Sequence, residues 1–102
     1  MANNKLQAIV SSMAQGDKKT ILYGLRHSGA LIRINGIVFA CVHKYADTNI
    51  VAQLIRLTKD NDTVMGYSVS QFAIAALDVL DIEKYDGKDE QIIDLINSNF
   101  VF

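Results

Sequence analysis

The chain has 102 residues, of which half are hydrophobic and 21% are charged, and its net charge is −1. This length suits one domain, spanning residues 1–102, and is too short for two. Proline is absent, so the chain lacks the residue that most often breaks helices, and an all-helical protein is favoured. The single cysteine, Cys41, excludes an internal disulfide.

The sequence gives no sign of export or of a membrane segment. The first 15 residues mix polar with apolar side chains, whereas a signal peptide needs a continuous apolar block. The longest apolar stretch, residues 30–42, is interrupted by Arg33 and Asn35. It is also shorter than the roughly 20 residues that a spanning helix requires. We therefore expect a cytoplasmic protein that does not contact a membrane.

Apolar residues recur at helical spacing along the first half of the chain. Residues 3–15 form one amphipathic helix, and Gly16 stands where a glycine commonly ends a helix. Asp17 is positioned to cap a second helix, which a Ser-Gly pair interrupts. A third helix, from about Ala30 to Tyr45, is apolar around most of its circumference. That pattern is typical of a helix covered on several sides.

The second half predicts three further helices. Asp47 or Thr48 caps the fourth, and Asp62 is expected to cap a fifth that runs from Thr63 to about Leu80. A sixth helix covers residues 88–98. The last three residues, Phe-Val-Phe, are apolar, and we expect them to fold back as a lid over the last helix; a sticky end offered to a partner is the alternative.

The turn Asp60-Asn61-Asp62 raises the question of a calcium site. An EF-hand loop needs oxygen ligands at positions 1, 3, 5 and 12 and a glycine at position 6. Counted from Asp60, position 5 is Val64, position 6 is Met65 and position 12 is Gln71. The loop therefore does not fit the EF-hand pattern. We predict that it caps a helix and binds no metal.

Catalytic and cofactor chemistry find little support in the sequence. Cys41 and His43 are two residues apart, which points their side chains to different faces of a helix. With only two histidines, a metal centre or a Ser-His-Asp arrangement would need most of its groups from acidic residues scattered along the chain. We expect no catalytic residue, no metal and no cofactor, and hence no enzyme.

A short helix followed by a longer, more apolar one occurs twice, at an offset of about 32 residues. The second unit resembles a HEAT repeat, whose second helix begins after a D-x-D turn. The positions that carry the resemblance are Asp60, Asp62, Met65, Ser68 and Val69, together with the pair Ile32-Arg33 in the first unit. Gly66 departs from the family pattern, which has an arginine there.

The resemblance covers residues 17–80 as two repeat units, with residues 1–16 as an N-terminal capping helix and residues 88–102 as a C-terminal capping helix and tail. It implies an all-α, short right-handed α-solenoid of about two and a half HEAT-like helical hairpins. Such armadillo-type helical repeat proteins serve mostly as binding surfaces, so the resemblance implies protein binding rather than a particular activity.

Charge is distributed unevenly along the chain. Residues 1–59 hold eight lysines and arginines and two aspartates, a net charge of +6. Residues 60–102 hold two lysines and nine acidic residues, a net charge of −7. In a solenoid, sequence order is spatial order, so one end would be basic and the other acidic. Accidental imbalance between solvated faces is the alternative interpretation.

These observations favour a non-catalytic protein–protein interaction adaptor, with weak head-to-tail self-association through the oppositely charged ends. The candidate binding residues are Lys18, Lys19, Arg26, His27, Arg33, Asp60 and Asp62. One alternative is a small immunity- or antitoxin-type inhibitor that uses the acidic residues Asp81, Glu83, Asp86, Asp89 and Glu90. A second alternative is nucleic-acid backbone binding through the basic half, which would weaken steeply with salt.

Overall fold

The computed structural model describes residues 2–101, with side chains from Lys5 to Val101. The helices are α1 (Ala2–Ala14), α2 (Lys18–Leu25), α3 (Ala30–Val42), α4 (Thr48–Leu57), α5 (Val69–Val79) and α6 (Glu90–Ser98). One antiparallel hairpin joins β1 (Thr63–Val64) to β2 (Tyr67–Ser68). The predicted all-α class is confirmed, with this hairpin as a small addition. No helix in the range described combines the length and the apolar character needed to cross a bilayer.

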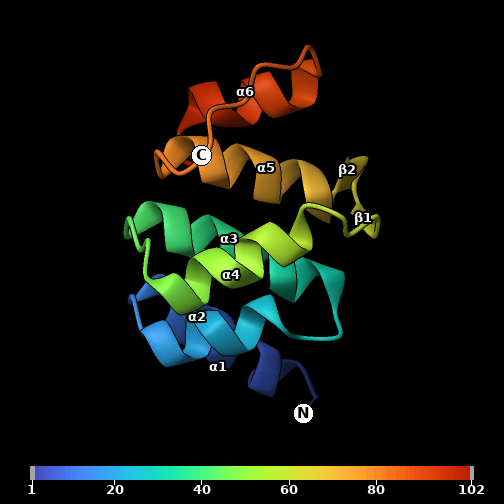
Figure 1. Cartoon of the computed structure of the whole chain (residues 1–102). Helices are drawn as coiled ribbons and strands as arrows, with labels where there is room; N and C mark the ends of the chain where they lie inside the picture. Colours follow the sequence, from blue (N-terminus) through green and yellow to red (C-terminus); the bar gives the residue numbers. More distant parts are fainter. Residues whose placement is uncertain (1, 102) are drawn as a thin grey trace.

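In Figure 1, α1 and α2 lie at one end, α3 and α4 overlap in the middle, and α5 and then α6 follow toward the other end. In one layer α1 packs against α3 and α3 against α5, while α2 packs against α4 beside them. Between the layers α2 packs against α3 and α4 against α5, and α6 packs against α5. The molecule measures 42 × 28 × 24 Å, with α1 and α2 at one end and α6 at the other (Figure 1).

One core runs through the whole stack. Its buried side chains extend from Met13 in α1 to Phe100 beyond α6. Two helical glycines allow the first helices to approach closely. A Cβ atom at Gly36 would lie 3.1 Å from the backbone nitrogen of Leu25, and one at Gly24 would lie 2.6 Å from the sulfur of Met13. The α2–α3 contact therefore depends on the absence of a side chain at Gly36.

The fifth helix begins at Val69 rather than at Thr63, so the prediction for residues 63–68 is wrong. These residues form the hairpin, and its two-residue turn has φ of +54° at Met65 and +86° at Gly66. Positive φ at both central positions is the signature of a type I′ hairpin turn. Ser68 then caps α5, since its Oγ accepts from the Gln71 N–H at 3.1 Å and the Gln71 side chain accepts from the Ser68 N–H at 2.8 Å.

Of the apolar tail predicted to cover the last helix, Phe100 folds back onto the core and Val101 does not. Phe100 is 1% exposed, and its ring centroid lies 6.2 Å from that of Phe72 in α5. Val101 remains exposed, and Phe102 lies outside the described residues. Phe100, which follows α6 in the chain, thus covers part of α5.

Candidate functional site

Arg33, predicted to lie on a basic surface, is instead buried in the interior with 9% of its surface exposed. Its Nε lies 3.2 Å from Asp60 Oδ2, and one terminal nitrogen pairs with Asp62. The other terminal nitrogen donates to the carbonyl oxygens of His27 and Ser28, each at 3.2 Å. The two carboxylates of the Asp-Asn-Asp turn therefore both pair with the Arg33 guanidinium.

This ion-pair cluster corrects two predictions. Asp62 does not cap a helix, because the chain after it forms β1 and its carboxylate faces Arg33. Arg33, Asp60 and Asp62 bind one another, and they link the basic and acidic halves of the sequence. The reason is geometric: the α3 N-terminus and the turn after α4 meet in space, 29 residues apart in the chain.

Two more of the predicted binding residues, Lys18 and His27, form polar contacts within the chain. Lys18 Nζ lies 3.1 Å from Asp47 Oδ2 and 4.7 Å from the centroid of the Tyr45 ring. His27 Nδ1 accepts a hydrogen bond from the Gly29 N–H at 2.9 Å, which fixes the turn between α2 and α3. Both side chains therefore have polar contacts within the chain.

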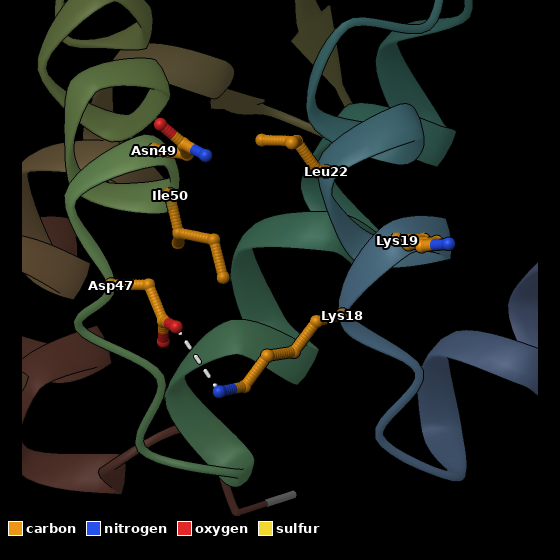
Figure 2. Close-up of a pocket in the computed structure, with 6 residues that line it drawn as sticks. All are labelled: Lys18, Lys19, Leu22, Asp47, Asn49 and Ile50. Atoms are coloured by element: carbon orange, nitrogen blue, oxygen red, sulfur yellow. Dashed lines mark hydrogen bonds and ion pairs between the residues drawn. The ribbon is translucent and has the colours of Figure 1, made fainter.

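Lys19 and Arg26 remain on the surface of α2. Together with Leu22 and Tyr23 they line an open hollow of about 320 Å³. A second hollow, of about 200 Å³, lies between α2 and α4. Figure 2 shows Lys18 reaching across this second hollow to Asp47, while Lys19 points away from that ion pair. Lys19 and Arg26 thus flank Tyr23 at the first hollow, and Lys18 lines the second.

The acidic residues near the C-terminus also separate into engaged and exposed groups. Lys84 donates to Asp81 at 2.8 Å and thereby lowers the pKa of that carboxyl. The Gln71 amide donates to Asp89 and lowers its pKa, and the backbone N–H groups of Gln91 and Ile92 act in the same direction. Asp89 is the N-cap of α6. Glu83, Asp86, Glu90 and Asp94 are also exposed.

An apolar groove across the other helix layer was not predicted. Its first hollow, about 360 Å³, lies between α1 and α3, and its second, about 310 Å³, lies between α3 and the hairpin. Leu31, which is 56% exposed, lines both. The apolar groove is lined by Leu6, Val10, Leu31, Ile32, Ile34, Val64, Met65, Tyr67 and Phe72, with Gln7, Ser11 and Asn35 at its first hollow.

The sequence held a signal for this groove. The helix at residues 30–42 is apolar on more sides than one packed layer can cover, and Leu31 falls on its uncovered side. The contribution of the hairpin could not be predicted, because the apolar spacing predicts a helix over Met65 and Tyr67 that does not form there. Only the hairpin brings them beside Leu31.

The groups capable of metal or nucleophilic chemistry are dispersed or buried. Among the described residues, no three His, Cys, Asp or Glu side chains gather in a way that could hold a metal ion. Burial raises the pKa of the Cys41 thiol to about 12, so the thiolate is scarce at neutral pH. His43 Nε2 lies 2.9 Å from the carbonyl oxygen of Ala14, at the end of α1.

Comparison with known proteins adds no relative: no family model, no curated protein and no solved structure matches this chain.

Proposed function

We propose that the chain is a non-catalytic protein-binding module whose apolar groove receives the partner. The observation that carries this proposal is that two adjoining apolar hollows share Leu31 and that no charged side chain lines either of them. Contiguous exposed apolar surface of this kind marks interaction sites in proteins whose other surfaces are polar. The predicted basic patch supports this function less, because Arg33 is buried and Lys18 pairs with Asp47.

The partner's chemistry follows from the lining. A charged side chain entering the groove would lose its hydration without gaining an ion pair, whereas Leu, Met or Phe would bury apolar surface. Each such side chain contributes roughly 1.5–3 kcal/mol when fully buried. The amide and hydroxyl groups of Gln7, Ser11 and Asn35 at the first hollow suit backbone or amide groups at the edge of the contact. We infer that the occupant is an amphipathic segment of another protein with an uncharged, apolar contact face.

The hairpin tip supports the same assignment. Met65 is 93% exposed, although it is a large apolar residue, and it holds φ of +54°. Both features are unfavourable in the isolated chain: apolar exposure opposes the hydrophobic effect, and positive φ strains a residue that has a Cβ atom. A binding role accounts for both, because the strained turn presents the Met65 side chain at the margin of the groove.

We further propose that the helices form a short right-handed solenoid of HEAT-like hairpins. The pairing of α2 with α3 and of α4 with α5 supports this arrangement, as does the stacking of α3 on α5 and of α2 on α4. Asp17 and Asp47 occupy the same place before α2 and α4, as expected of two repeat units. In such a stack the uncovered side of one helix layer serves as the binding surface.

Site-specific photocrosslinking tests the groove. A photoreactive amino acid is placed at Leu31, or at Val42 as a control, and crosslinked products formed in the source cell are identified by mass spectrometry. Val42 is also exposed and lies in the same helix, but it does not line the groove. We expect a discrete product from position 31 and none from position 42.

Binding measurements on the identified protein complete the test. Leu31→Glu should weaken binding at least tenfold, because it places an unpaired carboxylate in the groove, which corresponds to about 1.4 kcal/mol or more. Val42→Glu should leave the affinity unchanged. Equal products from both positions, or equal affinities of the two glutamate variants, would refute the groove as the binding site.

A further inference from the structure

The exposed face of α2 carries two cations and an aromatic ring at helical spacing. Lys19, Tyr23 and Arg26 lie at i, i+4 and i+7 and so share one face; we call this face the α2 stripe. Tyr23 is 53% exposed. In the part of the chain whose side chains are described, neither Lys19 nor Arg26 forms an ion pair. The stripe therefore offers unneutralised positive charge around a hollow that is lined by Leu22 and Tyr23.

The exposed face of α6 carries the complementary pattern. Glu90, Ile93, Asp94 and Asn97 lie at i, i+3, i+4 and i+7 of the helix; we call this face the α6 stripe. Ile93 is 37% exposed, and Glu90 and Asp94 are exposed beside it. Across residues 5–101, neither of these two carboxylates is paired with a lysine or arginine.

The two stripes cannot meet within one molecule. The α2 stripe belongs to the end of the stack that holds α1 and α2, and the α6 stripe belongs to the opposite end (Figure 1). The molecule is 42 Å long. Each stripe spans seven residue steps, which is about 10 Å of helix at 1.5 Å per residue. The stripes thus match in length, have opposite charge and lie at opposite ends.

We propose that the α2 stripe of one copy binds the α6 stripe of a second copy. Lys19 and Arg26 then face Glu90 and Asp94, and Ile93 enters the hollow beside Tyr23. Contact between two α2 stripes or between two α6 stripes would place like charges together, so the head-to-tail arrangement is the favoured one. Because it joins two different surfaces, each added copy leaves one stripe free at either end of the assembly, which grows as an open chain.

The contact is weak and depends on salt. Exposed ion pairs contribute little individually, and the charges interact over a Debye length of about 8 Å at physiological salt and about 30 Å at 0.01 M. One partly exposed isoleucine adds a small apolar contribution. Association is therefore expected at low ionic strength and high protein concentration, with monomers in high salt.

Charge reversal of each stripe separately, followed by mixing, tests the pairing. The first variant carries Lys19→Glu and Arg26→Glu, and the second carries Glu90→Lys and Asp94→Lys. Each alone has two stripes of the same sign, so each should stay monomeric in sedimentation velocity at about 0.01 M salt. An equimolar mixture restores one wild-type pair of stripes and should regain the concentration-dependent increase in sedimentation coefficient.

Three controls separate this contact from general charge effects. Lys44→Glu plus Lys59→Glu changes the net charge as the first variant does, but at exposed lysines outside the α2 stripe, and should still associate. Ile93→Ala keeps every charge and should weaken association. If a reversal variant fails to fold by circular dichroism, Lys19→Gln plus Arg26→Gln and Glu90→Gln plus Asp94→Asn replace the reversals, and each should associate less than the parent.

A parent protein that stays monomeric at low salt overturns the proposal. So does a dimer of fixed mass at every salt concentration, which would require a symmetric interface. Reversal variants that associate alone, or a mixture of them that stays monomeric, would show that α2 and α6 do not pair. None of these results bears on the apolar groove, which lies on the other helix layer.

Discussion

At the residue scale, the contacts of Arg33 have the clearest energetic consequences. The guanidinium of Arg33, a residue that is 9% exposed, is stable there because two carboxylates and two carbonyl oxygens surround it. Burial of such a cluster costs desolvation energy, and the attraction between the arginine and the two aspartates roughly offsets that cost. The cluster therefore acts by fixing the position of the turn after α4 relative to α3, and with it the position of the hairpin.

Loss of the guanidinium should expose this dependence. Arg33→Met keeps the volume of the aliphatic stem but leaves Asp60, whose side chain is 17% exposed, without its counter-ion. We expect a loss of about 3 kcal/mol in the free energy of unfolding, measured by urea denaturation. Asp62→Asn should cost less, because the Asp62 side chain is 65% exposed and partly screened by water. Equal costs for the two variants would argue against the unequal burial of the two acids.

Cys41 makes stability depend on pH in the alkaline range. Burial raises the pKa of its thiol from an ordinary value of 9.0 to about 12. Above pH 9 the unfolded chain loses this proton while the folded chain keeps it, so stability is present below pH 9 and falls as the pH rises toward 12. The parent should lose about 1.4 kcal/mol more per pH unit in this range than Cys41→Ala does.

Thiol labelling gives an independent measurement of the same burial. At pH 8 an aromatic disulfide reagent should react with native Cys41 far more slowly than with urea-unfolded chain. Rapid labelling of the folded protein would contradict both the burial and the raised pKa of this thiol.

At the scale of elements, close helix contacts rest on small residues. A Cβ atom at Gly36 would be tightly packed in the α2–α3 contact, since it would lie 3.1 Å from the backbone nitrogen of Leu25, which cannot rotate away. Glycine is otherwise unfavourable inside a helix by about 1 kcal/mol relative to alanine. Its presence here indicates that the contact it permits outweighs that cost.

Gly36→Ala should therefore destabilise the protein, by roughly 1–3 kcal/mol, despite the better helix propensity of alanine. Chemical denaturation monitored by circular dichroism measures the effect. An increase in stability would mean that α2 and α3 separate readily and that the helix contact contributes little.

At the scale of the whole molecule, the stack must close at its ends. Each inner helix is covered by neighbours on both sides, whereas α1 and α6 have neighbours on one side only. At the C-terminal end, Phe100 supplies part of the cover by packing against Phe72. The α6 stripe lies on a terminal helix, whereas the α2 stripe is the exposed side of a helix that also contacts α1, α3 and α4.

Removal of the Phe100 ring should destabilise the C-terminal end of the stack. Phe100→Ala is expected to cost about 3–5 kcal/mol, as for other fully buried aromatic residues, whereas the exposed neighbour Val101→Ala should cost little. Hydrogen exchange should show the largest loss of protection in α5 and α6. Uniform loss across all helices would instead indicate a fully cooperative molecule.

The sequence by itself determined the all-α class and the approximate extent of most helices, because helical spacing of apolar residues is a local property. The apolar tail was expected to cover the last helix or to bind a partner, and only the tertiary structure shows that Phe100 is buried while Val101 is exposed. The sequence could not place residues 63–68, because their turn has Met-Gly rather than the usual Asn-Gly, and the Ser68-Gln71 capping box lay inside an apparently continuous helix.

Only the tertiary structure decided which charges are available. Local spacing does not distinguish the basic residues of the first half from one another. In the structure Arg33 pairs with Asp62, and Lys18 pairs with Asp47, each across 29 residues. The apolar groove was decided in the same way, since its lining comes from α1, α3, α5 and the hairpin. Pairing and exposure depend on distances between segments remote in sequence, and local spacing carries no information about those distances.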